Sequence, residues 1–380
     1  MGFFTDKVVL ITGAAGTVGR ELIRQLIDLN PREIRAIDIN ESEVFFLDQD
    51  FIPLIKKKST ARKSSPIRFL ATVGDIRDSY RIEQAFRGVD IVLHAAALKH
   101  VILCERSPFE AVQTNIVGVN NVIRAAAENS VERVIFMSSD KAVNPTNVMG
   151  TSKLMGERLI STANSIHTGG KTIFSSTRFG NVIGSHGSVA PIFMKQIRNG
   201  GPVTLTNRCM TRFFMTVEQS AQLVLTATEL ACGGEVFVTK MPSMRIEDLA
   251  TTMIKMHAPK FGIKPDSIEI VQTGVKDGEK LYEELMSMEE NERAMELDKM
   301  FVILPFRLVR EDITYEYPNC VSDVVNEPYL SNDRPPMTLE EIESFLQDYF
   351  GSKHFTSRED YIPEEDAEEV SRRLEELGYL

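Results

Sequence analysis

Through about residue 185, short apolar runs alternate with stretches whose apolar residues recur at helical spacing. Runs that are apolar almost throughout are typical of strands buried on both faces, and such strands favour a parallel sheet with helices on both sides. Strands are predicted at 7–12, 34–39, 67–73, 91–95, 134–138 and 172–177. The pattern therefore predicts an α/β fold built on a doubly wound parallel sheet.

A helix is predicted over 110–129, where apolar residues form a continuous stripe. Asn115 lies inside that stripe. A polar residue in such a place needs a hydrogen-bond partner, so we expect Asn115 to have a structural role rather than a part in catalysis.

Beyond residue 181 the pattern becomes irregular and indicates a smaller α/β lobe. Short strands are predicted at 203–206, 235–238 and 267–271, and helices at 217–231 and 246–256. We expect a first domain over 1–185, with returning segments from about 207–240, and the smaller lobe over 186–300. A C-terminal extension over 301–380 carries two predicted helices, at 339–350 and 364–377.

Composition narrows the class of protein. The net charge of −11 argues against a nucleic-acid partner. The four cysteines lie far apart with no C-x-x-C pair, which argues against a zinc site and fits a reducing cytosol. No apolar run reaches the ~18 residues that span a bilayer, and the N-terminus lacks a signal-peptide layout. We expect a cytoplasmic protein without a membrane span or a metal.

A glycine-rich turn follows the first predicted strand and opens a helix, with the spacing G-x-x-G-x-x-G from Gly13 to Gly19. Glycines permit a tight turn and close approach of the backbone to a pyrophosphate, which the helix N-terminus favours. This context predicts a dinucleotide site in a Rossmann domain. The predicted cofactor contacts are Gly13, Ala15, Gly16, Thr17, Val18, Gly19, Asp38, Asp75, Ile76, Ala95, Ala96, Ala97 and Lys153.

Asp38 ends the second predicted strand, where a carboxylate can accept hydrogen bonds from the adenosine ribose. A carboxylate there repels a 2′-phosphate, so NAD is favoured over NADP. Asp75 follows the third strand and is placed either to contact the adenine or to cap a helix.

The segment 138–153 holds the candidate chemistry. Ser139 ends an apolar run, Asp140 and Lys141 follow it directly, and Met149 and Lys153 come later at i, i+4 spacing on one helical face. A charged pair directly after a buried strand is costly unless it is used, although a structural ion pair or a helix cap is the alternative.

The glycine turn, Asn115, Ser139, Lys153 and the segment 178–182 (RFGNV) resemble the extended short-chain dehydrogenase/reductases that act on nucleotide sugars. Segments 94–101, 138–153, 211–216, 234–243 and 278–284 are similar to the UDP-N-acetylglucosamine 4,6-dehydratase family of polysaccharide biosynthesis. The resemblance covers about residues 5–290. It implies an NAD-binding Rossmann domain, a nucleotide-sugar-binding lobe and a homo-oligomer.

A 4,6-dehydratase moves hydride from C4 to NAD⁺, removes the acidified C5 proton, protonates the departing C6 hydroxyl and returns hydride to C6. It therefore needs an acid–base pair that a dehydrogenase or an epimerase does not. We assign Asp140 as the acid at C6 and Lys141 as the base at C5. The pKa of Lys141 would then have to fall and that of Asp140 to rise.

Met149 stands where related enzymes carry the catalytic tyrosine, and a thioether has no titratable proton. Lys153 can still hold the nicotinamide ribose. The base at the C4 hydroxyl stays open between Asp140 and a water held by Ser139 and Lys153.

Seven residues are candidates for substrate binding: Lys99, His100, Asn181, Arg212, Lys240, Arg245 and Glu279. Of these, Arg212 suits the sugar diphosphate because a guanidinium binds phosphate bidentately. Two other functions remain open: a nucleotide-sugar 4-epimerase, which needs no Asp–Lys pair, and a catalytically silent NAD-binding regulator that exploits Met149.

Overall fold

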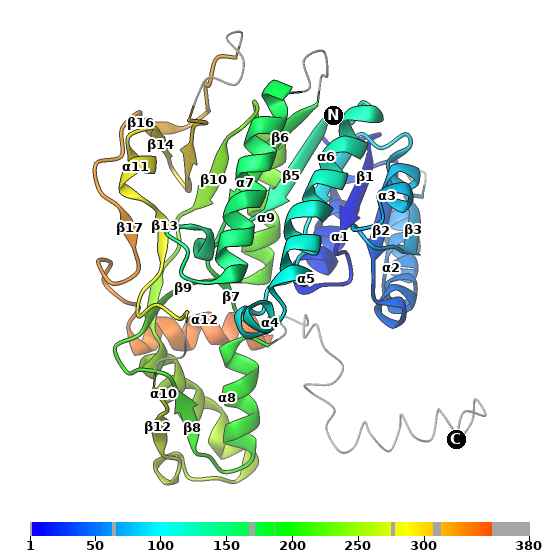
Figure 1. Ribbon diagram of the computed structural model, residues 1–380. Coiled ribbons are helices and arrows are strands. Elements are labelled where there is room, and N and C mark those ends of the chain that lie inside the picture. Colours follow the sequence, from blue (N-terminus) through cyan, green and yellow to red (C-terminus); the bar gives the residue numbers. More distant parts are fainter. Residues whose placement is uncertain are drawn as a thin grey trace, which may run out of the picture.

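The computed structural model describes residues 2–62, 66–166, 172–185, 187–274, 278–306 and 313–351. Its centre is a ten-stranded sheet with the order β16-β14-β15-β10-β6-β5-β4-β1-β2-β3 (Figure 1). Seven neighbouring strands are parallel: β1 (Val8–Thr12), β2 (Glu33–Asp38), β3 (Arg68–Val73), β4 (Ile91–His94), β5 (Arg133–Met137), β6 (Ile173–Arg178) and β10 (Val236–Thr239). Three antiparallel strands follow at one edge: β14 (Ala294–Leu297), β15 (Met300–Ile303) and β16 (Cys320–Ser322). The predicted doubly wound α/β fold is confirmed.

Helices cover both faces of this sheet. The flanking helices are α1 (Thr17–Leu29), α2 (Glu41–Arg62), α3 (Ser79–Phe86), α6 (Gly118–Glu128), α7 (Val148–Ile166) and α9 (Val217–Leu230). Alternate residues of β1 enter two different cores, because successive side chains of a strand point to opposite faces. Val9 and Ile11 pack in the core that contains α1 and α9, whereas Val8 and Leu10 pack in the core that contains α3 and α6.

The edge strand β3 departs from the expectation of burial on both faces. Its Leu70 and Val73 are 39% and 46% exposed. β3 has one neighbour, β2, and ends the sheet.

The second lobe is built from short strands and three helices, seen below the sheet in Figure 1. Its strands are β7 (Asn181–Val182), β8 (Val203–Leu205), β9 (Thr211–Met215), β11 (Ser243–Arg245) and β12 (Ile270–Gln272), and its helices are α8 (Val189–Arg198), α10 (Ile246–His257) and α12 (Leu339–Gly351). Ile342 and Leu346 of α12 are fully buried in the core that α8 and α10 share. The helix predicted over 339–350 is therefore confirmed, and the one over 364–377 lies outside the described residues.

The remaining elements are short. They are α4 (Val101–Arg106), α5 (Pro108–Val112), η1 (Gln113–Val117), η2 (Asp140–Ala142), η3 (Ala258–Phe261), η4 (Pro265–Ser267), α11 (Met288–Asn291), β13 (Glu284–Met286) and β17 (Tyr329–Leu330). Over the described ranges, no helix is long and apolar enough to cross a membrane.

One expectation needs correction. The single helix predicted over 110–129 is α5, a π-helical turn η1 and α6 in succession. Strands β14, β15 and β16 belong to the main sheet, although their residues fall in the predicted lobe and extension. The division at residues 185 and 300 remains a prediction about domains.

Candidate active site

The glycine turn forms a cradle against the end of β4. Gly13 has φ 67°, a left-handed conformation that favours glycine. A Cβ on Gly13 would lie 2.6 Å from the backbone nitrogen of Ala96, so Ala95–Ala97 pass directly over the turn. Gly16 precedes α1 and makes no side-chain cap. This uncapped helix start beside small residues fits a dinucleotide pyrophosphate.

Asp38 stands at the end of β2 as predicted. Its Oδ2 accepts a hydrogen bond from the Ala15 N–H at 3.0 Å, and its Oδ1 accepts one from the Asn40 N–H at 3.1 Å. The carboxylate is thus fixed beside the glycine turn, in the place from which a ribose hydroxyl can be bound.

Asp75 and Ile76 differ from expectation in detail. Asp75 accepts hydrogen bonds from the backbone and side chain of Arg77, while Asp78 caps α3. Asp75 is therefore not the cap of that helix. The Ile76 side chain is buried against Gly118 of α6, and its contact with a cofactor stays a prediction.

The chemistry-bearing turn follows β5. Ser139 is the N-cap of η2, and its Oγ donates to Asp140 Oδ1 at 2.6 Å. Lys141 Nζ donates to the same Oδ1 at 3.1 Å. The Asp140 side chain is fully buried, whereas that of Lys141 is 30% exposed. Lys141 is therefore the member of the pair that faces outward.

Glu283 completes this cluster and was not among the residues predicted from the sequence. Its Oε1 lies 3.0 Å from Lys141 Nζ and 3.2 Å from Arg212 Nε, and its Oε2 accepts a hydrogen bond from Asn181 Nδ2 at 2.8 Å. Asn181 and Arg212 were predicted to bind substrate, and the structure brings both to Glu283. The only signal in the sequence was that Glu283 lies in a segment that resembles the dehydratase family.

Arg212 makes one contact through each of its three guanidinium nitrogens. Besides its ion pair with Glu283, it donates from Nη1 to the Thr211 carbonyl and from Nη2 to the Lys280 carbonyl, each at 2.8 Å. Nη1 and Nη2 each keep a second N–H beside these contacts, so binding of a diphosphate by Arg212 stays a prediction. In this structure Arg212 balances the charge of the acid–base cluster.

The pKa shifts of the Asp–Lys pair run opposite to those expected. Burial favours the neutral acid, but Lys141 outweighs it and lowers the pKa of Asp140 to about 2. Burial also favours a neutral Lys141, but Asp140 and Glu283 outweigh it and raise the pKa of that ammonium. The expectation was wrong because Asp140 and Lys141 are oppositely charged and lie 3.1 Å apart, so each stabilises the charged form of the other. Asp140 rests ionised and Lys141 rests protonated.

The raised pKa that was expected of Asp140 is found at Glu283 instead. Burial and then the charge of Asp140 raise the pKa of Glu283 to about 7. Asp140 Oδ2 is buried and has no hydrogen-bond partner among the described residues.

Lys153 and Met149 lie on α7. Lys153 Nζ donates to the Met137 carbonyl at 2.9 Å and lies over the Phe136 ring. Burial lowers the pKa of Lys153 to about 8. Met149 is 3% exposed and packs with Cys104 and Ala111, so the position of the expected tyrosine is part of an apolar core.

Asn115 links three elements, as its structural role predicts. Its side chain accepts from the Leu98 N–H at 2.8 Å and donates to the Leu98 carbonyl and to Ser152 Oγ, both at 2.9 Å. The segment that contains Lys99 and His100 is thereby tied to α7. A Cβ on Gly187 would lie 2.6 Å from His100 Cε1, so His100 packs against the loop after β7.

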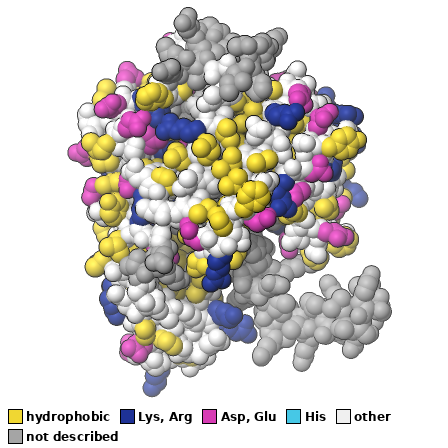
Figure 2. All heavy atoms as spheres, in the orientation of Figure 1, with side chains coloured by type: hydrophobic (Ala, Val, Ile, Leu, Met, Phe, Trp, Pro, Cys, Tyr) yellow, Lys and Arg dark blue, Asp and Glu magenta, His cyan; other side chains and the backbone are white. Residues whose placement is uncertain are grey.

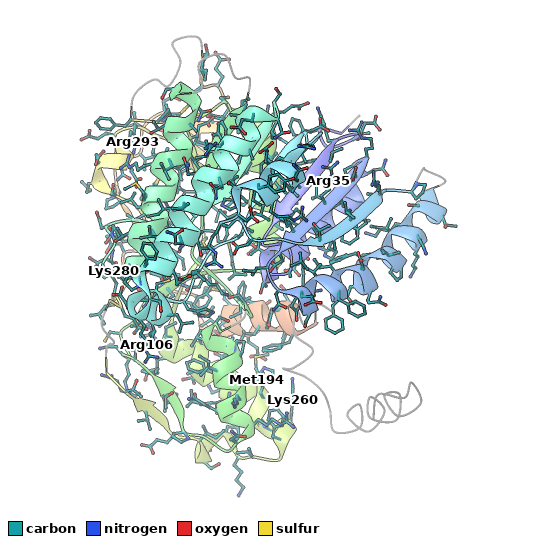
Figure 3. The ribbon with its side chains drawn as sticks, turned by 45° about the vertical axis from the view of Figure 1, so that its right-hand side comes forward. Arg35, Arg106, Met194, Lys260, Lys280 and Arg293 are labelled. Carbon is teal, nitrogen blue, oxygen red and sulfur yellow. The ribbon has the colours of Figure 1, made fainter. Side chains whose placement is uncertain are left out.

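The other predicted substrate residues are not part of the cluster. Lys240 pairs with Glu296 at 2.7 Å, and Arg245 pairs with Asp248 at 2.7 Å. Glu279 lies on the segment that crosses to the chemistry-bearing turn. In that segment Lys280 donates to the Val143 carbonyl at 3.1 Å, and Figure 3 labels Lys280 where the sheet meets the second lobe.

Comparison with known proteins identifies relatives of this chain. The "Uncharacterized membrane protein MJ1061" of Methanocaldococcus jannaschii is 48% identical over 80% of this chain and 87% of that protein. The "Capsular polysaccharide biosynthesis protein CapD" of Staphylococcus aureus is 40% identical over 75% of this chain, which matches only 46% of CapD. A protein of Rickettsia bellii named "UDP-glucose 4-epimerase" is 37% identical over 90% of this chain and 96% of that protein.

Solved structures agree on the fold. The "X-ray structure of Pen from Bacillus thuringiensis" has a TM-score of 0.81 and 38% identity, and covers 91% of this chain and 98% of that one. DesIV, a dTDP-glucose 4,6-dehydratase from Streptomyces venezuelae solved with NAD and TYD, has a TM-score of 0.59 and 21% identity, over 72% of this chain and 86% of that one. A family model described as "Polysaccharide biosynthesis protein" matches residues 9–305. This chain belongs to that polysaccharide biosynthesis protein family.

Proposed function

We propose that this protein is an NAD-dependent nucleotide-sugar 4,6-dehydratase that acts on UDP-N-acetylglucosamine and releases a UDP-4-keto-6-deoxy-N-acetylhexosamine. The observation that carries the proposal is the 3.1 Å contact between Lys141 Nζ and Asp140 Oδ1 on the turn after β5. Elimination across C5 and C6 needs an acid and a base close together. The family's role in polysaccharide biosynthesis supports a nucleotide sugar as substrate.

The cofactor proposed for the cradle is NAD. Gly13 lets the backbone approach a pyrophosphate, and Asp38 offers its carboxylate to the adenosine ribose while disfavouring a 2′-phosphate. The chemistry that bound NAD supplies is removal of hydride from C4 and its return to C6. Structures of similar fold hold NAD, such as that of DesIV.

The resting ion pair can carry out the elimination by one relay. Lys141 gives its ammonium proton to Asp140 and takes the C5 proton in its place. Asp140 then protonates the C6 hydroxyl, the C6–O bond breaks and water leaves. Each residue ends in its starting protonation state. The resting pKa shifts therefore add to the activation free energy of the relay but do not prevent it. In this scheme Lys141 is the base at C5 and Asp140 the acid at C6.

The base at the C4 hydroxyl is proposed to be a water held by Ser139 and Lys153. Met149 is buried among apolar side chains and has no proton to exchange. The pKa of Lys153, lowered by burial to about 8, leaves part of the side chain neutral near physiological pH. Asp140 is less suited, since its Oδ1 is already bound by Ser139 and Lys141.

A 4-epimerase is the second candidate, favoured by the name of the Rickettsia bellii relative. It would invert C4 and leave the C6 hydroxyl in place. Incubation with UDP-N-acetylglucosamine and with UDP-glucose, followed by NMR of the products, separates the two. A 6-deoxy-4-keto sugar supports the dehydratase, and a C4 epimer without loss of water contradicts it.

We further infer a homo-oligomer that works in the cytoplasm. Large apolar side chains of α4, α5 and α7 are exposed, among them Leu103, Phe109 and Met155. Figure 2 shows apolar side chains gathered over the middle of the face where these helices lie. Such a patch is typical of an interface between protein chains. Sedimentation velocity tests it, and a monomer at micromolar concentration contradicts it.

A further inference from the structure

Glu283 is the best-connected buried acid of the site and has no part in the relay described above. Its side chain is 6% exposed and comes from the segment before β13, far along the chain from the turn that it contacts. It meets Asp140 and Lys141 on η2, Arg212 on β9 and Asn181 on β7. A carboxyl in such a place affects the charge of every group around it.

We propose that Glu283 is a positioning residue whose protonation state decides whether Lys141 can pass its proton to Asp140, and that Ser331 of the C-terminal segment holds it in place. This inference rests on the proposed dehydratase function. It adds a third ionisable group to the site and gives the residues beyond the family-matched region a role in catalysis.

The charge of Glu283 bears directly on the relay. An ionised Glu283, 3.0 Å from Lys141 Nζ, places a second carboxylate on the ammonium and opposes the loss of its proton. A protonated Glu283 removes that negative charge from beside the Lys141 ammonium. The relay therefore runs when Glu283 is protonated and slows as Glu283 ionises. The pKa of Glu283, about 7, puts this change near neutral pH.

The backbone of Glu283 is held by Ser331, which follows β17 and lies outside the residues that the family model matches. The Glu283 N–H donates to Ser331 Oγ, and the Ser331 N–H donates to the Glu283 carbonyl, each at 2.9 Å. Ser331 Oγ also lies 2.8 Å from Thr211 Oγ1, next to Arg212. One buried hydroxyl thus joins the strand that carries Arg212 to the segment that carries Glu283.

The charged groups facing Glu283 are few. Asp140 is the neighbour that raises its pKa, and Lys141 and Arg212 lower it. On its own segment, Glu284 pairs with Lys280 at 3.3 Å and accepts from Asn144 at 2.7 Å. Both carboxylate oxygens of Glu284 therefore have partners, which are Lys280 and, in the loop after η2, Asn144.

Infrared difference spectroscopy of the protein without substrate tests the titration directly. We expect a protonated-carboxyl band that disappears with a midpoint near the raised pKa as the pH rises from about 5 to about 9. The band should be lost in Glu283→Gln and kept in Glu132→Gln, whose carboxylate pairs with Lys7 outside the site. A band unaffected by Glu283→Gln, or no band at all, overturns the inference whether or not the enzyme turns over a nucleotide sugar.

The pH–rate profile tests the consequence for catalysis. Wild-type turnover should fall about tenfold for each pH unit above the midpoint, and Glu283→Gln, which mimics the neutral acid, should lose this limb and stay active at high pH. A Glu283→Gln variant that is slower at every pH with the limb unchanged shows a merely structural role and overturns the inference. If the wild type turns over no nucleotide sugar, the proposed function fails, and the infrared titration still decides the state of Glu283.

Ser331→Ala tests the positioning contact while leaving every ionisable group in place. We expect the midpoint of the infrared band and of the pH–rate limb to move together, because the Glu283 backbone loses a hydrogen-bond acceptor. Ser331→Thr, which keeps the hydroxyl, should restore the wild-type midpoint. Unchanged midpoints in Ser331→Ala contradict a role for the C-terminal segment in holding Glu283.

Discussion

Gly150 of α7 lies directly against the backbone of Lys141: a Cβ at Gly150 would be 2.1 Å from the Lys141 carbonyl oxygen. The contact joins the helix that carries Lys153 to the turn that carries the acid–base pair. No flexible side chain can yield there, because the opposing atom is backbone. The N-terminal turn of α7 therefore sets the position of the Lys141 backbone relative to the end of β5.

Gly150→Ala should displace the turn and slow dehydration by about a hundredfold, the cost of an ångström-scale misplacement. NAD affinity, measured by fluorescence titration, should change little because the cradle is untouched. Gly156→Ala is the matched control on the same helix, since its Cβ would meet the Phe136 ring and not the turn. Equal losses of turnover in both variants would contradict this role of Gly150.

Met149→Ala should reduce stability more than chemistry. Met149 is 3% exposed, and truncation of a buried methionine costs about 2–5 kcal/mol in free energy of unfolding. Turnover per folded molecule should fall less in Met149→Ala than in Asp140→Asn or Lys141→Ala. Urea unfolding and initial rates measure the two effects. If Met149→Ala has the lowest turnover of the three, the assignment of roles is wrong.

Lys153→Met should stabilise the protein without cofactor while abolishing turnover. The pKa of Lys153 falls from 10.5 to about 8, so the folded state disfavours the ammonium that is present at pH 7. Removing this buried charge should add on the order of 1–3 kcal/mol to the free energy of unfolding, less the lost bond to the Met137 carbonyl. The gain should shrink as pH rises through about 8. A variant that is less stable than the wild type at pH 7 contradicts the shift.

Glu283 gives the stability of the protein a definite pH dependence. Its pKa is raised in the folded state, so its stabilising effect is full below the unfolded value of 4.5 and is lost as pH rises to about 7. Across that window the wild type should lose on the order of 3 kcal/mol relative to Glu283→Gln. Denaturant unfolding of both proteins at a series of pH values measures the difference. A difference independent of pH would contradict the raised pKa.

The first domain was predictable because its signals are local. Alternating apolar runs placed β1 to β6 to within a few residues, and the glycine turn located the dinucleotide cradle, because Gly13 and Gly16 act within one strand–helix unit. Asn115 was predicted as structural because a polar residue inside an apolar stripe must be satisfied nearby.

The acid–base cluster was only half predictable. Asp140 and Lys141 are neighbours in sequence, but Glu283 reaches them from a segment that no periodicity connects to β5. The pKa directions of Asp140 and Lys141 follow mainly from the contact within the pair, whereas the raised pKa of Glu283 could not be inferred from the sequence. Likewise, the ion pair of Arg212 with Glu283 was not visible in the sequence, and the role of Arg212 at a phosphate stays a prediction.

The central claim is elimination across C5 and C6 by Lys141 and Asp140, and isotope exchange tests it most directly. The protein is incubated with UDP-N-acetylglucosamine in D₂O, and the product is followed by NMR, with Lys141→Ala in parallel. We predict a 6-deoxy-4-keto sugar that carries deuterium at C5, formed by the wild type and not by the variant. A C4 epimer that keeps its C6 hydroxyl, or no product from the wild type, would contradict the account.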